Sequence, residues 1–430
     1  MEKVIQYMWQ HRLWRPSPLT TVYGEPVEVL DPGMQNLDAG PDFFNAKIRI
    51  GNRTWAGNVE IHERASDWKR HGHDSDHAYD SIILHVVTAD DARIIRSDGS
   101  EIPQAVLPSA LDFKKIYDRM TTSPAWELPC GAMLADIPAL YRTDWLTSLA
   151  FERIHAKAEH MGEIMRRTGH EWRGAVYVLL ARALGFGING DAMERLALAT
   201  PLQALIHHQG DIRAVESMMF GQAGFLDTQP GGEAEEKYLA ALRQDYGFLR
   251  KKYNLKQPGD LGWKLARMRP QNFPYRRIAY LARMVCDGFG IAAEMPSTDS
   301  IDAARRLFAI SLGDFWATHY SFTPAADRPG PQLSKRAVDI LIINVVVTAM
   351  YAYSKIYGDR SSLEKCVGLL QSLPPEDNRI TRLFTSAGIE CPDAFTSQAL
   401  IQLRRCYCEP RKCLRCRFGS RLLNSSFRTR

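Results

Sequence analysis

Two alternating segments joined by a turn signal constrain the fold of this chain more than any other feature. Apolar and polar side chains alternate from Asp42 to Ile50, and they alternate again from Trp55 to His62. The Gly51-Asn52 dipeptide between them favours a tight turn. Because successive side chains of a strand point to opposite faces, each segment has one face suited to burial. The sequence therefore predicts a β-hairpin with one buried face.

The segments around this hairpin extend it to a mixed α/β unit. Met1–Trp14 is typical of a short helix and Pro26–Leu30 of a short strand. Ser66 can cap a second short helix after the hairpin. Ser81–Thr88 is a continuous apolar run, which is typical of a strand buried on both faces. The predicted order is helix, three strands, helix, strand.

The rest of the chain is predicted to be mostly helical. Helical periodicity, interrupted by glycine and proline clusters, extends over residues 135–400. Residues 401–430 are rich in cysteine and arginine. We therefore expect an α+β protein with an α/β domain over residues 1–125, a helical domain over residues 135–400 and a Cys-rich basic C-terminal segment over residues 401–430.

The composition is that of an ordinary folded protein. Apolar residues make up 45% of the chain and charged residues 24%, which excludes disordered and collagen-like classes. The longest apolar stretch, Ile340–Tyr353, is interrupted by Asn344 and Thr348 and is shorter than the ~20 residues of a membrane span. Met1–Trp14 lacks an apolar core followed by a cleavage site. We expect a cytoplasmic protein with no membrane partner.

Two acidic residues bracket the hairpin. Pro41-Asp42 opens its first strand, and Glu60-Ile61-His62 closes its second. Glu60 and His62 share one face, and an odd-length loop or a bulge would bring Asp42 to that face, whereas a plain two-residue loop would not. Carboxylates meeting there can hold Mg²⁺ or Mn²⁺, with the Ile61 carbonyl as a third oxygen ligand. A metal held in this way activates water for attack on a phosphodiester.

This arrangement resembles the core of the PD-(D/E)XK nucleases. That fold has the same order of elements; its Asp and its Asp or Glu bind metal, and its Lys positions or activates water. Asp42 and Glu60 match the two acidic positions, but His62 stands where Lys is usual. Histidine can act as a general base near neutral pH but supplies no fixed positive charge there. The resemblance implies a nuclease with Asp42, Glu60 and His62 as catalytic residues, and Glu28 on the preceding strand is a further carboxylate candidate.

Five of the twelve histidines lie at the end of the hairpin or soon after it. The run HGHDSDH, His71 to His77, is similar to the HxHxDH motif of the metallo-β-lactamase fold but has one residue too many before its Asp-His pair. Three interpretations stay open for His71, His73 and His77: support of metal or substrate beside Glu60, a metal-hydrolase site of their own, or a solvent-exposed polar helix. His85 lies inside the apolar strand and is expected to be a core histidine.

Four of the eight cysteines fall in the C-terminal segment. Cys413 and Cys416 have the spacing of a zinc knuckle. Together with Cys406 their spacing is also similar to the iron–sulfur loop of some DNA glycosylases, whose fourth cysteine is absent here. Clustered cysteines in a cytosolic chain indicate a metal before a disulfide. We expect structural Zn²⁺, before an iron–sulfur cluster, at Cys406, Cys408, Cys413 and Cys416, the alternative being free thiols.

Positive charge is concentrated in two segments. The formal net charge is +5, and residues 401–430 carry nine basic residues and one acid. Arg250–Arg277 carries the same numbers, interleaved with aromatic residues, as suits phosphate contact and base stacking. Two prolines make part of this segment a rigid loop, whose arginines either bind phosphates or pin helix ends inside the fold. The predicted nucleic-acid contacts are Lys264, Arg267, Arg269, Arg276 and Arg277.

Six segments carry a second resemblance. They are NLDAGPDF (36–43), WAGNVEIH (55–62), FGING (186–190), FGQAGFL (220–226), WKLARMRPQNFPYRRIA (263–279) and YCEPRKCLRC (407–416). Across them the chain resembles a bacterial family of unknown function, the domain of unknown function 2851 family. This resemblance implies that the α/β and helical parts occur together, but it implies no activity.

Three hypotheses for function follow. The first is a metal-dependent nuclease that cleaves phosphodiester bonds of nucleic acid with Mg²⁺ or Mn²⁺. The second is a non-catalytic nucleic-acid-binding or adaptor protein that keeps the nuclease fold. The third is a metal hydrolase of another class that uses the cluster from His71 to His77. Nucleic acid is the expected partner in the first two.

Overall fold

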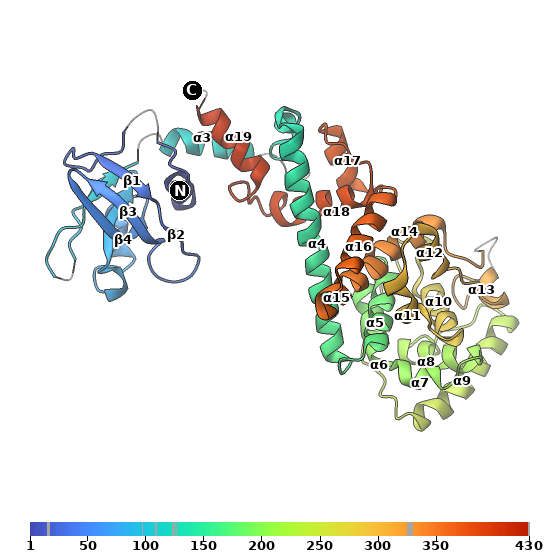
Figure 1. The fold of residues 1–430 in the computed structure, drawn as a ribbon. Coiled ribbons are helices and arrows are strands. Elements are labelled where there is room, and N and C mark those ends of the chain that lie inside the picture. The colour runs from blue at the N-terminus through green and yellow to red at the C-terminus, as the bar shows by residue number, and fades with distance from the viewer. Residues whose placement is uncertain are drawn as a thin grey trace. The chain divides into compact units, whose positions relative to one another are not determined.

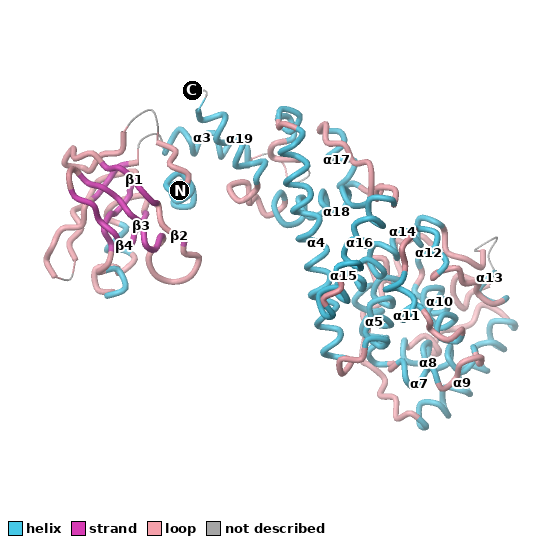
Figure 2. Tube along the Cα trace, viewed as in Figure 1, coloured by secondary structure: helices cyan, strands magenta, loops and turns pink. Residues whose placement is uncertain are grey.

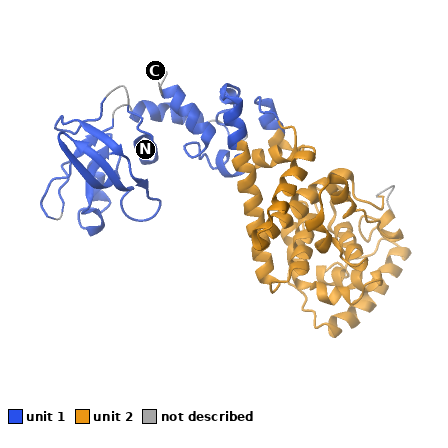
Figure 3. Cartoon of the chain, viewed as in Figure 1, with its two compact units in different colours: residues 1–145, 382–390, 403–430 blue, residues 146–381, 391–402 orange. Residues whose placement is uncertain are grey.

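The chain forms two compact units (Figure 3). The computed structural model describes residues 1–14, 18–96, 98–107, 110–122, 124, 127–324 and 330–428. Unit 1 comprises Met1–Trp145, Arg382–Glu390 and Leu403–Arg430, and unit 2 comprises Leu146–Thr381 and Cys391–Gln402. The C-terminal segment therefore belongs to the same unit as the N-terminus. The predicted domain boundary at residue 125 lies outside the described residues.

Unit 1 is built around a mixed β-sheet (Figures 1 and 2). The strand order is β1-β3-β4-β5-β6, with β2 beside β3. β1, β3 and β4 are antiparallel, whereas β5 runs parallel to β4 and β6 parallel to β5. The predicted order of elements is present, with short β2 and β6 added. The bounds are α1 (Glu2–Gln10), β1 (Val27–Asp31), β2 (Met34–Gln35), β3 (Phe43–Ile50), β4 (Arg53–Ile61), α2 (Asp67–Arg70), β5 (Ile82–Val87), β6 (Gln104–Val106), α3 (Ala110–Thr121) and α19 (Arg417–Arg428), with 3-10 turns at His77–Tyr79 and Gly131–Asp136.

The core of unit 1 lies between the sheet and its helices. Ala46, Ile48 and Ile50 of β3 are buried and alternate with exposed residues, as the period of two predicts. Every residue of β5 is buried, as expected for a strand inside the sheet. Trp9 of α1 packs into the same core. Each large apolar side chain buried here stabilises the fold by roughly 1.5–3 kcal/mol.

The C-terminal helix α19 packs on the N-terminal part of unit 1, beside α3 (Figure 1). The hydroxyl group of Tyr7 lies 2.6 Å from Ser420 Oγ and donates to Asn424 Oδ1 at 3.0 Å. The rings of Phe113 and Phe427 meet edge to face with centroids 5.4 Å apart. These contacts explain why residues 403–430 belong to unit 1.

A bulge in β3 shifts its pairing with β4 by one residue. Ala46 pairs with Gly57 and Ile50 with Arg53, but at Phe43 the register has moved by one. Asn45 lies at the shift with φ +56°, in the left-handed region. Its backbone N–H donates to Asn58 Oδ1 at 3.1 Å, outside the regular ladder. The bulge turns every side chain before it to the opposite face.

This bulge decides a question that the sequence left open. The hairpin turn at Gly51-Asn52 is the plain two-residue kind, because Ile50 pairs directly with Arg53. With that turn alone, Asp42 would lie on the opposite face of the hairpin from Glu60. The extra residue at Asn45 restores Asp42 to the face of Glu60.

Because Asn45 has a positive φ, substitutions at this position are expected to change the free energy of unfolding. Glycine and asparagine tolerate positive φ, whereas β-branched residues avoid it. Asn45→Val is therefore expected to lower the free energy of unfolding by about 1–3 kcal/mol, and Asn45→Gly to change it by less than about 1 kcal/mol. Urea unfolding of both variants checks this expectation. Equal destabilisation by both would show that the backbone conformation at Asn45 is not what matters.

Unit 2 consists of helices and connecting loops (Figures 2 and 3). Its helices include α4, which begins in unit 1, and α17, which continues into unit 1 from Arg382. Their bounds are α4 (Ala139–Arg167), α5 (Trp172–Leu184), α6 (Gly190–Ala199), α7 (Leu202–Ile206), α8 (Ile212–Ala223), α9 (Glu233–Lys252), α10 (Pro274–Cys286), α11 (Ile291–Glu294), α12 (Ile301–Arg306), α13 (Asp314–Thr318), α14 (Lys335–Leu341), α15 (Val347–Tyr357), α16 (Arg360–Ser372), α17 (Arg379–Ser386) and α18 (Ala394–Gln402).

One helical run in unit 2 is longer than the apolar stretch seen in the sequence. α14, a π-helical turn at Ile342–Val346 and α15 continue without a break from Lys335 to Tyr357, which is 23 residues. By length and composition alone this run could cross a membrane, with a mean hydropathy of 1.7 in its most apolar window. That window is 72% buried inside the structure.

A buried carboxyl group in α8 links the stability of unit 2 to pH. Glu216 is 3% exposed, accepts a hydrogen bond from Trp316 Nε1 at 3.0 Å and accepts another from the hydroxyl of Tyr238. Burial raises the pKa of the Glu216 carboxyl to about 7, although these two hydrogen bonds and the charge of Arg283 oppose the rise. The folded state therefore favours the protonated acid.

Stability is expected to fall as pH rises through the pKa of Glu216. Because the folded pKa lies above the ordinary value of 4.5, its contribution is fully present below pH 4.5 and is lost as pH approaches 7. Glu216→Gln has no charge to lose and accepts a hydrogen bond through its amide oxygen. Between pH 5 and pH 8 the wild type should lose on the order of 2 kcal/mol more than this variant. Urea unfolding at both pH values measures the difference, and parallel curves would contradict the expectation.

Candidate metal centre in unit 1

The β3 bulge brings two carboxyl groups together beside the hairpin. The backbone N–H of Asp42 donates to Glu60 Oε2 at 3.1 Å. The carboxyl of Asp42 accepts from the backbone N–H of Ile61 at 3.0 Å and from the side chain of Gln6 in α1 at 2.8 Å. Asp42 and Glu60 are thus held side by side by hydrogen bonds to backbone and helix.

Burial makes it costly for both groups to ionise. Glu60 is 5% exposed, and burial, followed by the charge of Asp42, raises the pKa of Glu60 to about 9. Burial also raises the pKa of Asp42 to about 6, although the hydrogen bonds from Gln6 and Ile61 oppose the rise. Adjacent buried carboxyls of this kind are typical of functional sites, and a bound cation would stabilise both in their ionised form.

Two histidine rings lie beside the other oxygen of Glu60, and a third histidine contacts one of them. Glu60 Oε1 lies 3.4 Å from His73 Nε2 and 3.6 Å from His62 Nε2. His62 Nε2 in turn lies 3.1 Å from His71 Nδ1. One ring nitrogen from each histidine belongs to a group whose members all lie within 4.8 Å of one another. The motif after the hairpin therefore joins the acidic pair, so two separately considered sites are one.

A chain of hydrogen bonds determines which nitrogen of His62 carries the proton. The side-chain amide of Gln104 donates to the Ala92 carbonyl at 2.9 Å, so its oxygen accepts from His85 Nδ1 at 3.0 Å. His85 Nε2 is then the acceptor, and His62 Nδ1 donates to it at 2.8 Å. His62 Nε2 is consequently an acceptor, and its lone pair faces His71 Nδ1 at 3.1 Å, beside Glu60 and His73.

Burial keeps this chain of imidazoles neutral. It lowers the pKa of His62 to about 2 and that of His85 to about 4, and it lowers the pKa of His73 as well. Trp68 and Tyr79 pack against the rings: the Tyr79 ring stacks on His73 with centroids 3.8 Å apart. Neutral imidazoles with an outer hydrogen-bond acceptor on the second nitrogen are the form that ligates metals.

Two predicted supporting residues lie elsewhere. His77 is exposed and contacts Asp80, with Nδ1 2.9 Å from the carboxyl oxygen. Glu28 of β1 forms an ion pair with Arg49 at 2.6 Å, and both side chains are largely exposed. These partners place His77 and Glu28 outside the group formed by Asp42, Glu60, His62, His71 and His73. We call this group the carboxylate–histidine cluster.

The predicted nucleic-acid contacts divide into exposed and buried groups. Lys264, Arg267 and Arg269 are exposed. Arg276 and Arg277, at the start of α10, are each 4% exposed, so neither guanidinium group is offered at the surface, as the predicted nucleic-acid contact would require. The guanidinium of Arg276 donates to the carbonyls of Trp316, His319 and Gly330, and that of Arg277 donates to Asn272 and lies over the ring of Phe186. They pin loops to α10, which is the alternative that the sequence left open.

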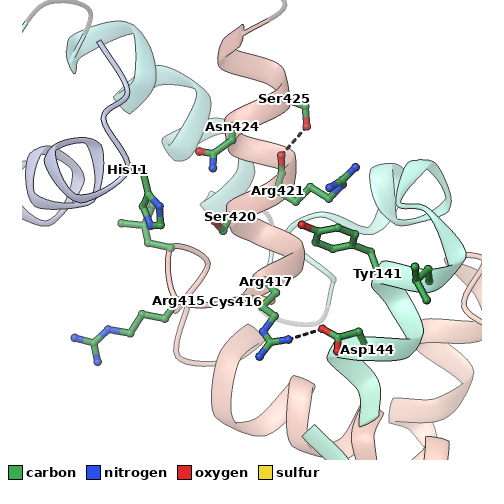
Figure 4. A pocket seen from close by; sticks show the side chains of 12 residues that line it. His11, Tyr141, Asp144, Arg415, Cys416, Arg417, Ser420, Arg421, Asn424 and Ser425 are labelled. Carbon is green, nitrogen blue, oxygen red and sulfur yellow. Dashed lines mark hydrogen bonds and ion pairs between the residues drawn. The ribbon is translucent and has the colours of Figure 1, made fainter. Parts of the chain in front are cut away.

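A separate hollow of about 1090 Å³ lies in unit 1 between α19 and the start of α4 (Figure 4). Arg415 and Arg421 line it, together with Tyr141, over whose ring the Arg421 guanidinium lies at 4.1 Å. Arg417, also in the lining, forms an ion pair with Asp144. The hollow is basic and aromatic, and its lining includes no residue of the carboxylate–histidine cluster.

Sequence reasoning missed the contribution of His85 and Gln104 to the site. His85 appeared to be a core histidine, and it is indeed fully buried, but its register partner in the sheet is Glu60. A polar side chain inside an otherwise apolar strand is the signal that could have drawn attention to it, because a buried polar group needs a partner.

Comparison with known protein families shows to which family the chain belongs. The family model described as "Protein of unknown function (DUF2851)" matches residues 2–379. The chain belongs to this family. The DUF2851 match includes the sheet, the acidic pair and the histidines, whereas the cysteines from Cys406 to Cys416 lie beyond its end. No curated protein and no solved structure matches the chain.

Metal binding at the cluster is expected to stabilise the protein. Mn²⁺ at about 100 times its dissociation constant should raise the free energy of unfolding of wild type by about 2.7 kcal/mol. Glu60→Gln keeps an oxygen for the Asp42 N–H but loses the charge, so it should unfold like wild type without metal and gain no stability with it. Urea unfolding with and without Mn²⁺ measures this, with Glu63→Gln, an exposed neighbour, as the control. Equal gains in all three proteins would place the metal elsewhere.

Proposed function

We propose that the chain is a metal-dependent hydrolase of the nuclease type, which cleaves phosphodiester bonds of nucleic acid. The observation that carries the proposal is the orientation of His62 Nε2. The hydrogen bonds from Gln104 through His85 leave this nitrogen unprotonated, and it lies beside Glu60 Oε1 and His71 Nδ1, with His73 Nε2 3.4 Å from the same Glu60 oxygen. Such second-shell support is what metal-ligating histidines usually have.

The donor atoms of the cluster favour a transition metal. Imidazole nitrogens suit ions such as Zn²⁺, and carboxylates suit Mn²⁺ and Mg²⁺. A shell of His62, His71, His73 and Glu60 therefore suits Mn²⁺ or Zn²⁺ better than the Mg²⁺ considered from the sequence. A divalent ion at such a site lowers the pKa of a bound water and stabilises negative charge on a phosphate.

The protein's own residues would hold the site in place. Glu60 supplies the carboxyl oxygen nearest the histidines, and Asp42, fixed by Gln6 and Ile61, adds a second negative charge toward the cation. Because Glu60 and His62 are almost fully buried, electrostatic interactions there are stronger than in water. The rigid sheet on which these side chains stand keeps their geometry fixed.

Two features support nucleic acid as the substrate. The order of helix, three strands, helix and strand, with Asp42 and Glu60 at the acidic positions, is the order of the nuclease core that the sequence resembles. In the same unit, Arg415, Arg421 and Tyr141 line the hollow of Figure 4, a combination suited to phosphates and stacked bases.

One departure favours a second candidate, a nucleic-acid-binding protein without turnover. His62 stands where the resembled nucleases carry Lys, and burial keeps His62 neutral by lowering its pKa to about 2. A nuclease core that lacks the fixed positive charge of that position would still bind nucleic acid through its basic surfaces.

A cleavage assay separates the two candidates. Wild type with Mn²⁺, Zn²⁺ or Mg²⁺ is expected to cut a mixture of single- and double-stranded DNA and RNA. Glu60→Gln and His73→Ala each remove a ligand and should lower the rate by roughly 100-fold or more, because the metal is held less tightly. His77→Ala, an exposed histidine of the same run, is the matched control and should keep wild-type activity. Absence of cleavage by wild type, together with salt-sensitive binding, would favour the binding protein.

A further inference from the structure

The cysteines and the arginines of the C-terminal segment differ in their surroundings. Cys408, Cys413 and Cys416 are buried and Cys406 is half-buried, but the side chains grouped closely enough to hold a metal ion, in the described part of the chain, are histidines and include no cysteine. The arginines line the hollow of about 1090 Å³ between α19 and the start of α4 (Figure 4). Of the two sets, the arginines therefore face open space that a ligand can enter.

Three parts of unit 1 line this hollow. One wall is α19 with the residues just before it, and the facing wall is the start of α4, whose side chains lie opposite those of α19 (Figure 4). His11, which follows α1, also lines the hollow. The volume of about 1090 Å³ slightly exceeds the ~300–1,000 Å³ that is typical of small-molecule pockets. A segment of a polymer therefore fits the hollow as well as a small molecule does.

The positive charge in the hollow is only partly neutralised. Arg417 forms an ion pair with Asp144, and its guanidinium group lies 4.9 Å from the centre of the Trp145 ring. Arg415 and Arg421, in contrast, have no carboxylate partner in the part of the chain that the structure describes. The planar fork of N–H donors in a guanidinium group matches the oxygens of a phosphate. Two such groups are therefore available to an anionic ligand.

An exposed aromatic ring lies directly beside one of these free guanidinium groups. Tyr141 is 47% exposed, and the Arg421 guanidinium lies over its ring, 4.1 Å from the ring centre. Leu140, the residue before it, is 82% exposed and adds apolar surface to the same wall. Nucleobases stack on aromatic rings and on the planes of arginine side chains. The hollow therefore combines donors for phosphate with a platform for a base.

The aromatic platform decides which polyanion suits the hollow. An acidic peptide offers carboxylates to the arginines but no flat ring to Tyr141. In a nucleic-acid duplex the bases are paired and stacked on one another, so that only their edges are open to a protein. A ring such as that of Tyr141 can therefore stack only on a base that is unpaired.

We propose that this hollow binds unpaired nucleotides of a DNA or RNA strand, with a base stacked at Tyr141 and Arg421 and phosphates held by Arg415 and Arg421. The inference rests on the proposed function for nucleic acid as the ligand, and it narrows that class to single strands and single-stranded regions. The hollow includes no residue of the carboxylate–histidine cluster. A strand should therefore bind there without any metal.

Fluorescence anisotropy of the full-length protein in EDTA tests this proposal in the absence of cleavage. The probes are a short fluorescent oligothymidylate, a matching oligouridylate and the corresponding DNA duplex. Wild type should bind the single strands roughly 5- to 150-fold more tightly than the duplex, which is the effect of one stacked base. Tyr141→Ala should lose this factor, whereas Tyr141→Phe, which keeps the ring, should retain it. Arg421→Ala should weaken binding and reduce its salt dependence, and Arg53→Ala, an exposed arginine of β4, is the matched control.

Several results of this assay would overturn the proposal. They are no binding of the single strands, equal affinity for single strand and duplex, unchanged binding by Tyr141→Ala, or equal binding of an abasic strand of the same length. Displacement of the probe by polyglutamate as readily as by unlabelled strand would assign the hollow to an acidic protein instead.

The outcome is separate from that of the cleavage assay. A protein that binds single strands through Tyr141 but cuts no substrate would support the role of the hollow and contradict the hydrolase. A protein that cuts nucleic acid, and whose Tyr141→Ala variant binds single strands like wild type, would support the hydrolase and contradict the role of the hollow.

Discussion

The one-residue bulge at Asn45 is the constraint on which the chemistry of unit 1 depends. In antiparallel pairing, a shift of one residue moves a side chain to the other face of the sheet. The two-residue turn at Gly51-Asn52 would separate Asp42 from Glu60, and the bulge brings them together. On the opposite edge of β4, parallel pairing with β5 places His85 beside Glu60. Strand register thus assembles the acidic pair and the support of the histidine cluster.

The carboxylate–histidine cluster contains buried ionisable side chains, which do not favour folding by themselves. Glu60, His62 and His85 are buried where ionisation is costly, and yet they lie together in place of apolar partners. The hydrogen bonds from Gln104 through His85 to His62 satisfy the outer nitrogens and leave the inner ones directed at Glu60. Natural proteins depart from the rules of good packing mainly at functional sites, which is why this cluster carries the functional proposal.

Local patterns were predictable from the sequence, and distant pairings were not. The hairpin follows from alternation and the buried strand β5 from a continuous apolar run, and both are patterns among neighbouring residues. The side of the hairpin on which Asp42 lies was left open, because a bulge at Asn45 changes register without changing the alternating pattern. For Arg276 the sequence left phosphate binding and a structural role both open, because its partners are carbonyl groups some forty residues later in the chain.

The most direct test of the account is a crystal structure of the protein soaked with Mn²⁺, with data collected near the manganese absorption edge. An anomalous peak is expected within bonding distance of Glu60 Oε1 and of ring nitrogens from His62, His71 and His73, in line with ordinary metal–ligand distances of ~2.0–2.3 Å. His85 and Gln104 should keep their present hydrogen bonds. A peak only at surface carboxylates, or a His62 ring turned away from Glu60, would contradict the central claim.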